Sequence, residues 1–201
     1  MIVDVASTDV VKVYRLLAGV VTPRPIAWVT TVDAEGHVNL APFSFYNAFG
    51  ANPPVVVFSP TLRRDGSRKD TLRNLEVIPE FVLNAVVEDL AEPMNLTAKE
   101  LPPGQSEAEF AGLALAPSLK VRPPRVAASP VHMECKLHQI VSIGQGPIAA
   151  NLVIGEVLLL HVDEAVLDPS GQIDPRKLRT IARLGGDYYC RSTDLFEMRR
   201  P

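Results

Sequence analysis

The chain has 201 residues, of which 47% are hydrophobic, a formal net charge of -3 and a sequence pI near 5.8. This length and apolar content suit a single domain over residues 1–201 with a full hydrophobic core. The slightly acidic balance argues against a general nucleic-acid-binding protein, and no apolar run is long enough to span a membrane.

Two further features concern the compartment. Cys135 and Cys190 lie far apart and match no metal or redox spacing, so we expect free thiols in a reducing compartment. The first residues lack the basic start and the cleavage site of a signal peptide. We therefore expect a cytoplasmic protein with neither a membrane nor a nucleic acid as partner.

The first part of the chain predicts one helix followed by strands. Apolar residues at helical spacing behind a capping aspartate predict a helix over Asp9–Ala18, ended by Gly19. Three strands should follow, the first two as a hairpin: residues 26–32, 38–46 and 55–58. Pro42 cannot donate to a ladder, so we expect it at an edge or bulge, where the chain bends.

A basic loop follows the third of these strands. Ser67 and Asp70 fit a capping box that would begin a helix reaching about Glu76. Around this expected helix start lie four cations: Arg63, Arg64, Arg68 and Lys69. The positive end of a helix dipole disfavours cations, so we hypothesise a phosphate site built from backbone N–H groups, hydroxyls and these side chains. The alternative is an ordinary solvated basic surface.

The second part of the chain predicts further strands around a long excursion. The expected strands are residues 80–87, 131–143 and 152–162. Residues 88–130 contain two helical pieces, near 90–98 and 106–111, and we expect them to cover the barrel. Asp174 and Pro175 should begin a last helix, with Gly185 past its end. The pattern predicts a mainly β protein, an antiparallel β-barrel of about six strands with added helices.

No pattern in the chain indicates a metal site or a catalytic side chain. His132 and His138 share the polar face of a strand with Glu134, while Cys135 lies on its apolar face, and no further ligand is near in sequence. Ser44 lacks the context of a nucleophile elbow. We therefore predict neither a metal nor a covalent nucleophile.

Several segments resemble, in order and over nearly the whole chain, the flavin reductase-like, FMN-binding split-barrel family that includes flavoredoxin. The segments are TPRPIAWVTT, NLAPFSFYNAF, PPVVVFSP, RKDTLRN, EFVLN, PPRVAASPVHMEC, LVIGEV and ARLGGDYY. The resemblance implies a homodimeric, six-stranded split barrel that holds FMN near the subunit interface. It also implies electron transfer from NADH or NADPH to flavin, or between flavin and another redox partner such as an oxygenase component.

By position, the resemblance also implies flavin contacts. The backbone along the isoalloxazine ring would be that of Ser44, Phe45, Tyr46 and Asn47. Ribityl contacts would come from Ser59 and Pro60, and phosphate contacts from Arg64, Lys69, Asp70 and Thr71. Further contacts are expected from Thr30, Thr31 and Tyr188. Ala128 stands where relatives often carry an acidic residue, so we assign no carboxylate role there.

Since the flavin itself supplies the redox chemistry, no catalytic acid or base is required. Two alternatives stay open. One is an electron-carrying flavoprotein without nicotinamide activity. The other is a non-enzymatic β-barrel module that binds a phosphorylated ligand or an acidic partner through the basic loop.

Overall fold

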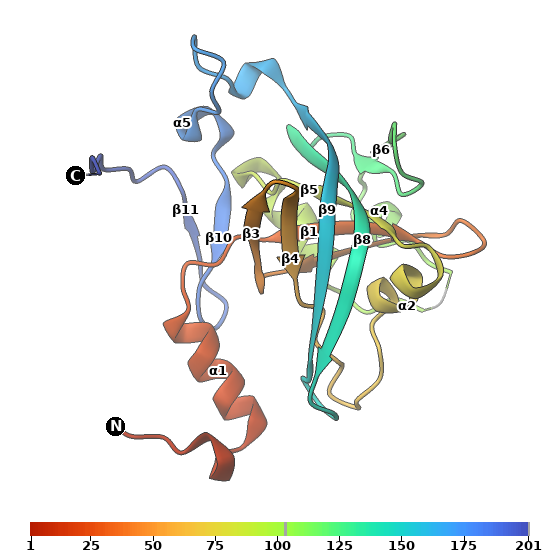
Figure 1. Ribbon diagram of the computed structural model, residues 1–201, viewed down its shortest axis with the longest axis vertical. Helices are drawn as coiled ribbons and strands as arrows, with labels where there is room; N and C mark the ends of the chain where they lie inside the picture. The colour runs from red at the N-terminus through yellow and green to blue at the C-terminus, as the bar shows by residue number, and fades with distance from the viewer. Residues whose placement is uncertain (103, 201) are drawn as a thin grey trace.

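The computed structural model describes residues 1–102 and 104–200, and its centre is one antiparallel sheet (Figure 1). The sheet has seven strands in the order β2-β1-β5-β8-β9-β4-β3. Their bounds are β1 Ala27–Val32, β2 Val38–Phe43, β3 Tyr46–Ala51, β4 Pro54–Phe58, β5 Glu80–Asn84, β8 Val131–Ile143 and β9 Ala150–Val162. The two edge strands, β2 and β3, are consecutive in the chain, so the sheet curves back toward itself as an open barrel. The expected mainly β, antiparallel class is confirmed.

The expected strand over residues 38–46 is wrong, because two strands occupy this stretch. Phe43 is the last residue of β2 and pairs with Ala27, whereas Tyr46 begins β3 and pairs with Phe58. The two residues between them carry the chain from one edge of the sheet to the other. The missed strand β3 makes the count seven rather than six, and Pro42 lies in an edge strand as expected.

The core has two parts, one on each face of β1. Inside the barrel, Phe58 and Phe81 pack with side chains from α2 (Asp70–Val77). On the outer face, Trp28 packs with Met94 and Val126 from the excursion. This excursion comprises η2 Glu88–Leu90, α3 Ala91–Leu96, α4 Glu107–Phe110, β6 Leu115–Ala116 and β7 Arg125–Val126. The described residues within 88–130 therefore cover the barrel, as expected.

The polar face expected for β8 is buried at its first half. Glu134 is 0% exposed, and its carboxylate accepts hydrogen bonds from the backbone N–H groups of Leu119 and Lys120 and lies 2.6 Å from His161 Nε2. Burial alone would raise the pKa of Glu134, but these bonds together lower it. The excursion supplies the donors, which a pattern of alternation along one strand cannot reveal. Burial raises the pKa of the Cys135 thiol, which keeps it unreactive.

Three predicted helix boundaries need correction. The first helix, α1 (Val10–Val20), is capped by Asp9 as expected but continues through Gly19. The second, α2, begins at Asp70; the backbone N–H of Arg63 donates to the carbonyl of Ser67, so Ser67 belongs to the preceding loop and caps nothing. The last, α5 (Pro175–Leu178), is capped by Asp174 but ends at once, because Arg179 adopts a left-handed conformation.

The remaining short elements lie near the ends of the chain. They are η1 Val5–Ser7, η3 Glu164–Val166, β10 Ile181–Arg183 and β11 Tyr189–Arg191. The β10–β11 hairpin occupies the stretch where the last helix was expected to end, and α1 projects from the barrel (Figure 1). Among the described residues, no helix is long and apolar enough to cross a membrane.

Candidate functional site

A groove runs along the edge of the barrel where β2 ends. Its first part is a cavity of about 710 Å³ bordered by α1, α3, Ser44 and the β10–β11 hairpin. Its second part, of about 500 Å³, shares Tyr14, Arg15 and Arg64 with the first and reaches Lys69. A smaller part of about 130 Å³ joins Lys69 to Phe43. Because the parts share lining residues, we treat them as one site and call it the edge groove.

The bend between β2 and β3 carries unpaired backbone donors, and Ser44 of this bend lines the groove. The carbonyl of Phe45 accepts a hydrogen bond from the backbone N–H of Ser59 at 2.8 Å. The backbone N–H groups of Ser44 and Phe45 donate to no other group in the part of the chain that the structure describes. Unpaired backbone donors at a strand end are available to a ligand. The Phe45 ring lies edge-on to Tyr14 of α1, with their centroids 5.9 Å apart.

The following two residues differ in exposure. Tyr46 is partly buried, and burial raises the pKa of its phenol to about 12. The Asn47 side chain accepts a hydrogen bond from the backbone N–H of Ala48 at 2.8 Å and is exposed. Tyr46 is therefore neutral near physiological pH, and it can offer a hydrogen bond but no charge.

Three cations of the edge groove have no partner. Within residues 1–102 and 104–200, the side chains of Arg15, Arg64 and Lys69 make no hydrogen bond and no ion pair, while Lys69 Nζ lies 5.3 Å from the centroid of the Phe43 ring. Burial lowers the pKa of Lys69, repulsion from Arg63 lowers it further, and Glu100 opposes this in part. An anion beside Lys69 would relieve both unfavourable effects.

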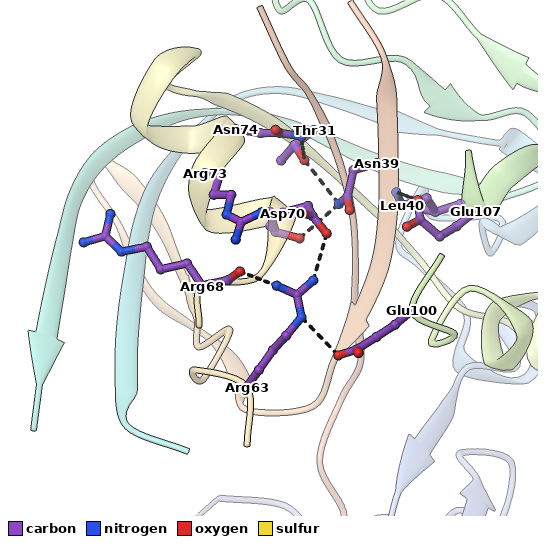
Figure 2. A network of polar contacts seen from close by, with 11 residues as sticks. Thr31, Asn39, Leu40, Arg63, Arg68, Asp70, Arg73, Asn74, Glu100 and Glu107 are labelled. Atoms are coloured by element: carbon purple, nitrogen blue, oxygen red, sulfur yellow. Dashed lines mark hydrogen bonds and ion pairs between the residues drawn. The ribbon is translucent and has the colours of Figure 1, made fainter. Parts of the chain in front are cut away.

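Arg63 holds the loop that carries Arg64 and Lys69, through the contacts drawn in Figure 2. Its Nη2 lies 2.8 Å from Asp70 Oδ2, its Nε lies 3.0 Å from Glu100 Oε1, and its Nη1 donates to the carbonyl of Arg68. Arg73 contacts the other oxygen of Asp70 at 3.2 Å. The Asp70 carboxylate is thus occupied by two arginines, and it organises the loop beside Lys69.

Two of the threonines expected at the site, Thr31 and Thr71, accept hydrogen bonds from asparagine side chains, and Figure 2 labels Thr31. Thr31 is 0% exposed, and its Oγ1 accepts from Asn74 Nδ2 at 3.0 Å. Thr71 lines the small part of the groove, and its Oγ1 accepts from Asn39 Nδ2 at 3.0 Å. Thr30 is also fully buried and accepts from Asn84 Nδ2 at 2.9 Å. Thr30 and Thr31 therefore support the strand from within and offer no exposed surface.

The other expected contacts lie at different depths. Ser59 and Pro60 are buried; Ser59 Oγ accepts from the backbone N–H of Asn151, and the Pro60 carbonyl accepts from its side chain. Tyr188 is 75% exposed and lies outside the lining of the edge groove, whereas Tyr189 lines the large cavity. The structure thus brings Ser44, Arg64, Lys69, Asp70 and Thr71 to the groove.

Sequence reasoning missed Arg24, which lines the large cavity from within. It is 5% exposed, and its Nε donates to Ser44 Oγ at 3.3 Å. Its other nitrogens donate to the carbonyls of Ala18, Val21 and Leu184. Burial lowers its pKa, yet an arginine stays protonated in proteins. The available signal was a lone charge between two prolines directly before an apolar strand.

Comparisons with known proteins identify the family of this chain. The sequence matches the family model of the flavin reductase-like domain over residues 20–181. The chain belongs to the flavin reductase-like family. Nitrilotriacetate monooxygenase component B from Bacillus cereus has a similar structure, with a TM-score of 0.92, 36% identity and coverage of 98% of both chains.

Two other solved structures extend the comparison. The 2-nitrobenzoate 2-nitroreductase NbaA of Pseudomonas fluorescens is 33% identical, with a TM-score of 0.89 and coverage of 100% of this chain and 96% of that one. Flavoredoxin of Desulfovibrio vulgaris has a TM-score of 0.74 at 19% identity, with coverage of 100% and 97%, which shows a shared fold. The family and the two neighbours above 30% identity support a flavin-binding oxidoreductase.

Proposed function

We propose that this protein binds FMN in the edge groove and reduces it with NADH or NADPH. The observation that carries the proposal is one groove that combines the unpaired cations Arg15, Arg64 and Lys69 with unpaired backbone N–H groups at the bend of Ser44 and Phe45. A terminal phosphate needs cationic donors, and the edge of a flavin ring carries hydrogen-bond acceptors. The donor set therefore fits FMN at both ends.

Each part of the groove has a separate task in this proposal. Lys69 and Arg64 hold the phosphate, and Arg63 with Asp70 keeps their loop in place. The bend at Ser44 and Phe45 orients the ring. When bound, the flavin supplies hydride acceptance, so the protein needs only to position the reactants and exclude water.

The large cavity beside Ser44 is the proposed place for the nicotinamide. Its volume of about 710 Å³ lies within the range of pockets that enclose a whole small ligand. Arg15 and Arg183 line it, and guanidinium groups suit the phosphates of a dinucleotide. The 36% identity to a monooxygenase component supports a further proposal, that reduced flavin serves an oxygenase or another redox partner.

We also propose that two copies form a homodimer. The edge strand β3 pairs with β4 on one side only, and Phe49 on it is 68% exposed. On α1, apolar residues such as Val10 and Leu17 are exposed, and Ala18 alone is buried. Exposed edges and apolar patches of this kind are normally covered. Light scattering should report a dimer that Phe49→Asp weakens, and a monomeric wild-type protein would refute this part.

The test of the reaction is anaerobic mixing of the FMN-loaded protein with NADH and, separately, NADPH. The proposal predicts that one or both remove the visible absorption of the bound flavin. Persistent absorption with both donors would identify an electron carrier that takes its electrons elsewhere. A protein that does not bind FMN at all would favour the binding module and refute the proposal.

A further inference from the structure

Arg24 is a buried cation without a counter-ion. Its side-chain partners are three backbone carbonyls and the hydroxyl of Ser44, all of them neutral. Across the described ranges, no carboxylate forms an ion pair with it. Buried charges in proteins are normally paired, because removal from water is costly. The wall of the large cavity therefore holds a positive charge that the protein itself does not neutralise.

Arg24 and Ser44 both keep a hydrogen-bond donor that can serve a ligand. A guanidinium has five N–H groups. The Nε–H and both Nη1–H groups of Arg24 are used, as is one Nη2–H, so one Nη2–H is without a partner among the described residues. Ser44 Oγ accepts from Arg24, which leaves the hydroxyl proton of Ser44 to donate elsewhere. Ser44 lines the cavity at the bend proposed to face the flavin ring.

We propose that Arg24 is a positioning residue for flavin reduction: it fixes the Ser44 hydroxyl toward the ring and stabilises the negative charge that the flavin acquires. The inference rests on the proposed function. Hydride transfer moves two electrons and one proton from the nicotinamide ring, which becomes a cation, to the flavin, which becomes an anion. A buried positive charge interacts with that anion more strongly than an exposed charge does.

Two sets of contacts tie Arg24 to its surroundings, one through its backbone and one through its side chain. Its backbone pairs with that of Arg183 through hydrogen bonds of 2.9 and 2.8 Å, which anchors β10. Its guanidinium joins the end of α1, the hairpin and Ser44, and it lies 5.8 Å from the centroid of the Phe45 ring. A purely structural role would need the fork of hydrogen bonds but not the charge. The two roles can therefore be separated.

The test is the two-electron midpoint potential of bound FMN in the wild-type protein and in Arg24→Gln, Arg24→Lys and Ser44→Ala. We expect Arg24→Gln to reduce the preference for reduced over oxidised FMN at least tenfold, equivalent to a potential about 30 mV lower. Arg24→Lys retains the charge and should recover most of that difference. Ser44→Ala removes one hydrogen bond of Arg24 but retains the positive charge, so it should lower the potential by a smaller amount.

The control is Arg122→Gln, which removes the same charge from an exposed position outside the groove lining. It should leave the potential unchanged. Circular dichroism checks that each variant is folded. If Arg24→Gln does not fold, the potential of Ser44→Ala provides the test. Bound FMN whose potential is the same in Arg24→Gln or Ser44→Ala as in the wild type would overturn this inference alone. A wild-type protein that binds no FMN would overturn the proposed function as well.

Discussion

Replacing Lys69 by alanine should weaken FMN binding without affecting riboflavin. Lys69 Nζ has no hydrogen-bond or ion-pair partner among the described residues and its side chain is only partly exposed, so a bound phosphate would form a charge-assisted hydrogen bond there. Such bonds contribute about 1.5–3 kcal/mol, which is roughly a ten- to hundredfold change in dissociation constant. Arg64 and Arg15 remain nearby, so the lower half of this range is expected. Riboflavin lacks the phosphate and should lose little.

The assay is fluorescence titration of FMN and of riboflavin with the wild-type protein, Lys69→Ala and Lys136→Ala. Lys136 lies exposed on β8 and supplies a matched loss of one charge away from the edge groove. An unchanged dissociation constant for FMN in Lys69→Ala would refute the placement of the phosphate. An equal loss for FMN and riboflavin would show that the substitution disturbs the groove rather than a phosphate contact.

Three further predictions concern ionisation and packing. A bound phosphate should raise the lowered pKa of Lys69. FMN affinity should therefore be highest below the pKa that Lys69 has without FMN, and it should fall as pH rises through the higher pKa that Lys69 has with FMN bound. An FMN dissociation constant that does not change from neutral pH upward would contradict this. Gly155→Ala would place a methyl group against the buried ring of Phe81 and should lower the free energy of unfolding in urea by about 1–3 kcal/mol. The control Gly19→Ala has open space around the new methyl group and should not lower the stability. Equal urea midpoints for Gly155→Ala and the wild-type protein would contradict this prediction. Glu134→Gln should lower the free energy of unfolding by about 1–3 kcal/mol at neutral pH. The stabilising charge of Glu134 is fully present above the unfolded-state pKa, so the stability difference between wild type and variant should shrink as pH falls through the lowered pKa of the folded state. A stability difference that does not change with pH would argue against a charged, buried Glu134.

Local patterns predicted most of the sheet. Apolar runs between prolines located β4, and the alternation around Cys135 located β8. The strand β3 was missed because its pattern continues that of β2 without a break, and only pairing across the barrel separates them. Burial of Glu134 was missed for a similar reason, since its partners come from the excursion.

The candidate site also combines features that the sequence reveals with features that only the folded structure reveals. The concentration of cations near Lys69 is visible in the sequence and by itself favours a phosphate site. The occupation of Asp70 by Arg63 and Arg73 depends on the folded loop, and so does the contact between Arg24 and Ser44. Residues that act through long-range contacts leave little trace in a local pattern.

A crystal structure of the protein with FMN would test the central claim most directly. The account predicts flavin density in the edge groove, with the phosphate against Lys69 and Arg64 and the ring along the bend at Ser44 and Phe45. Density in another part of the molecule, or the phosphate directed away from Lys69, would contradict it.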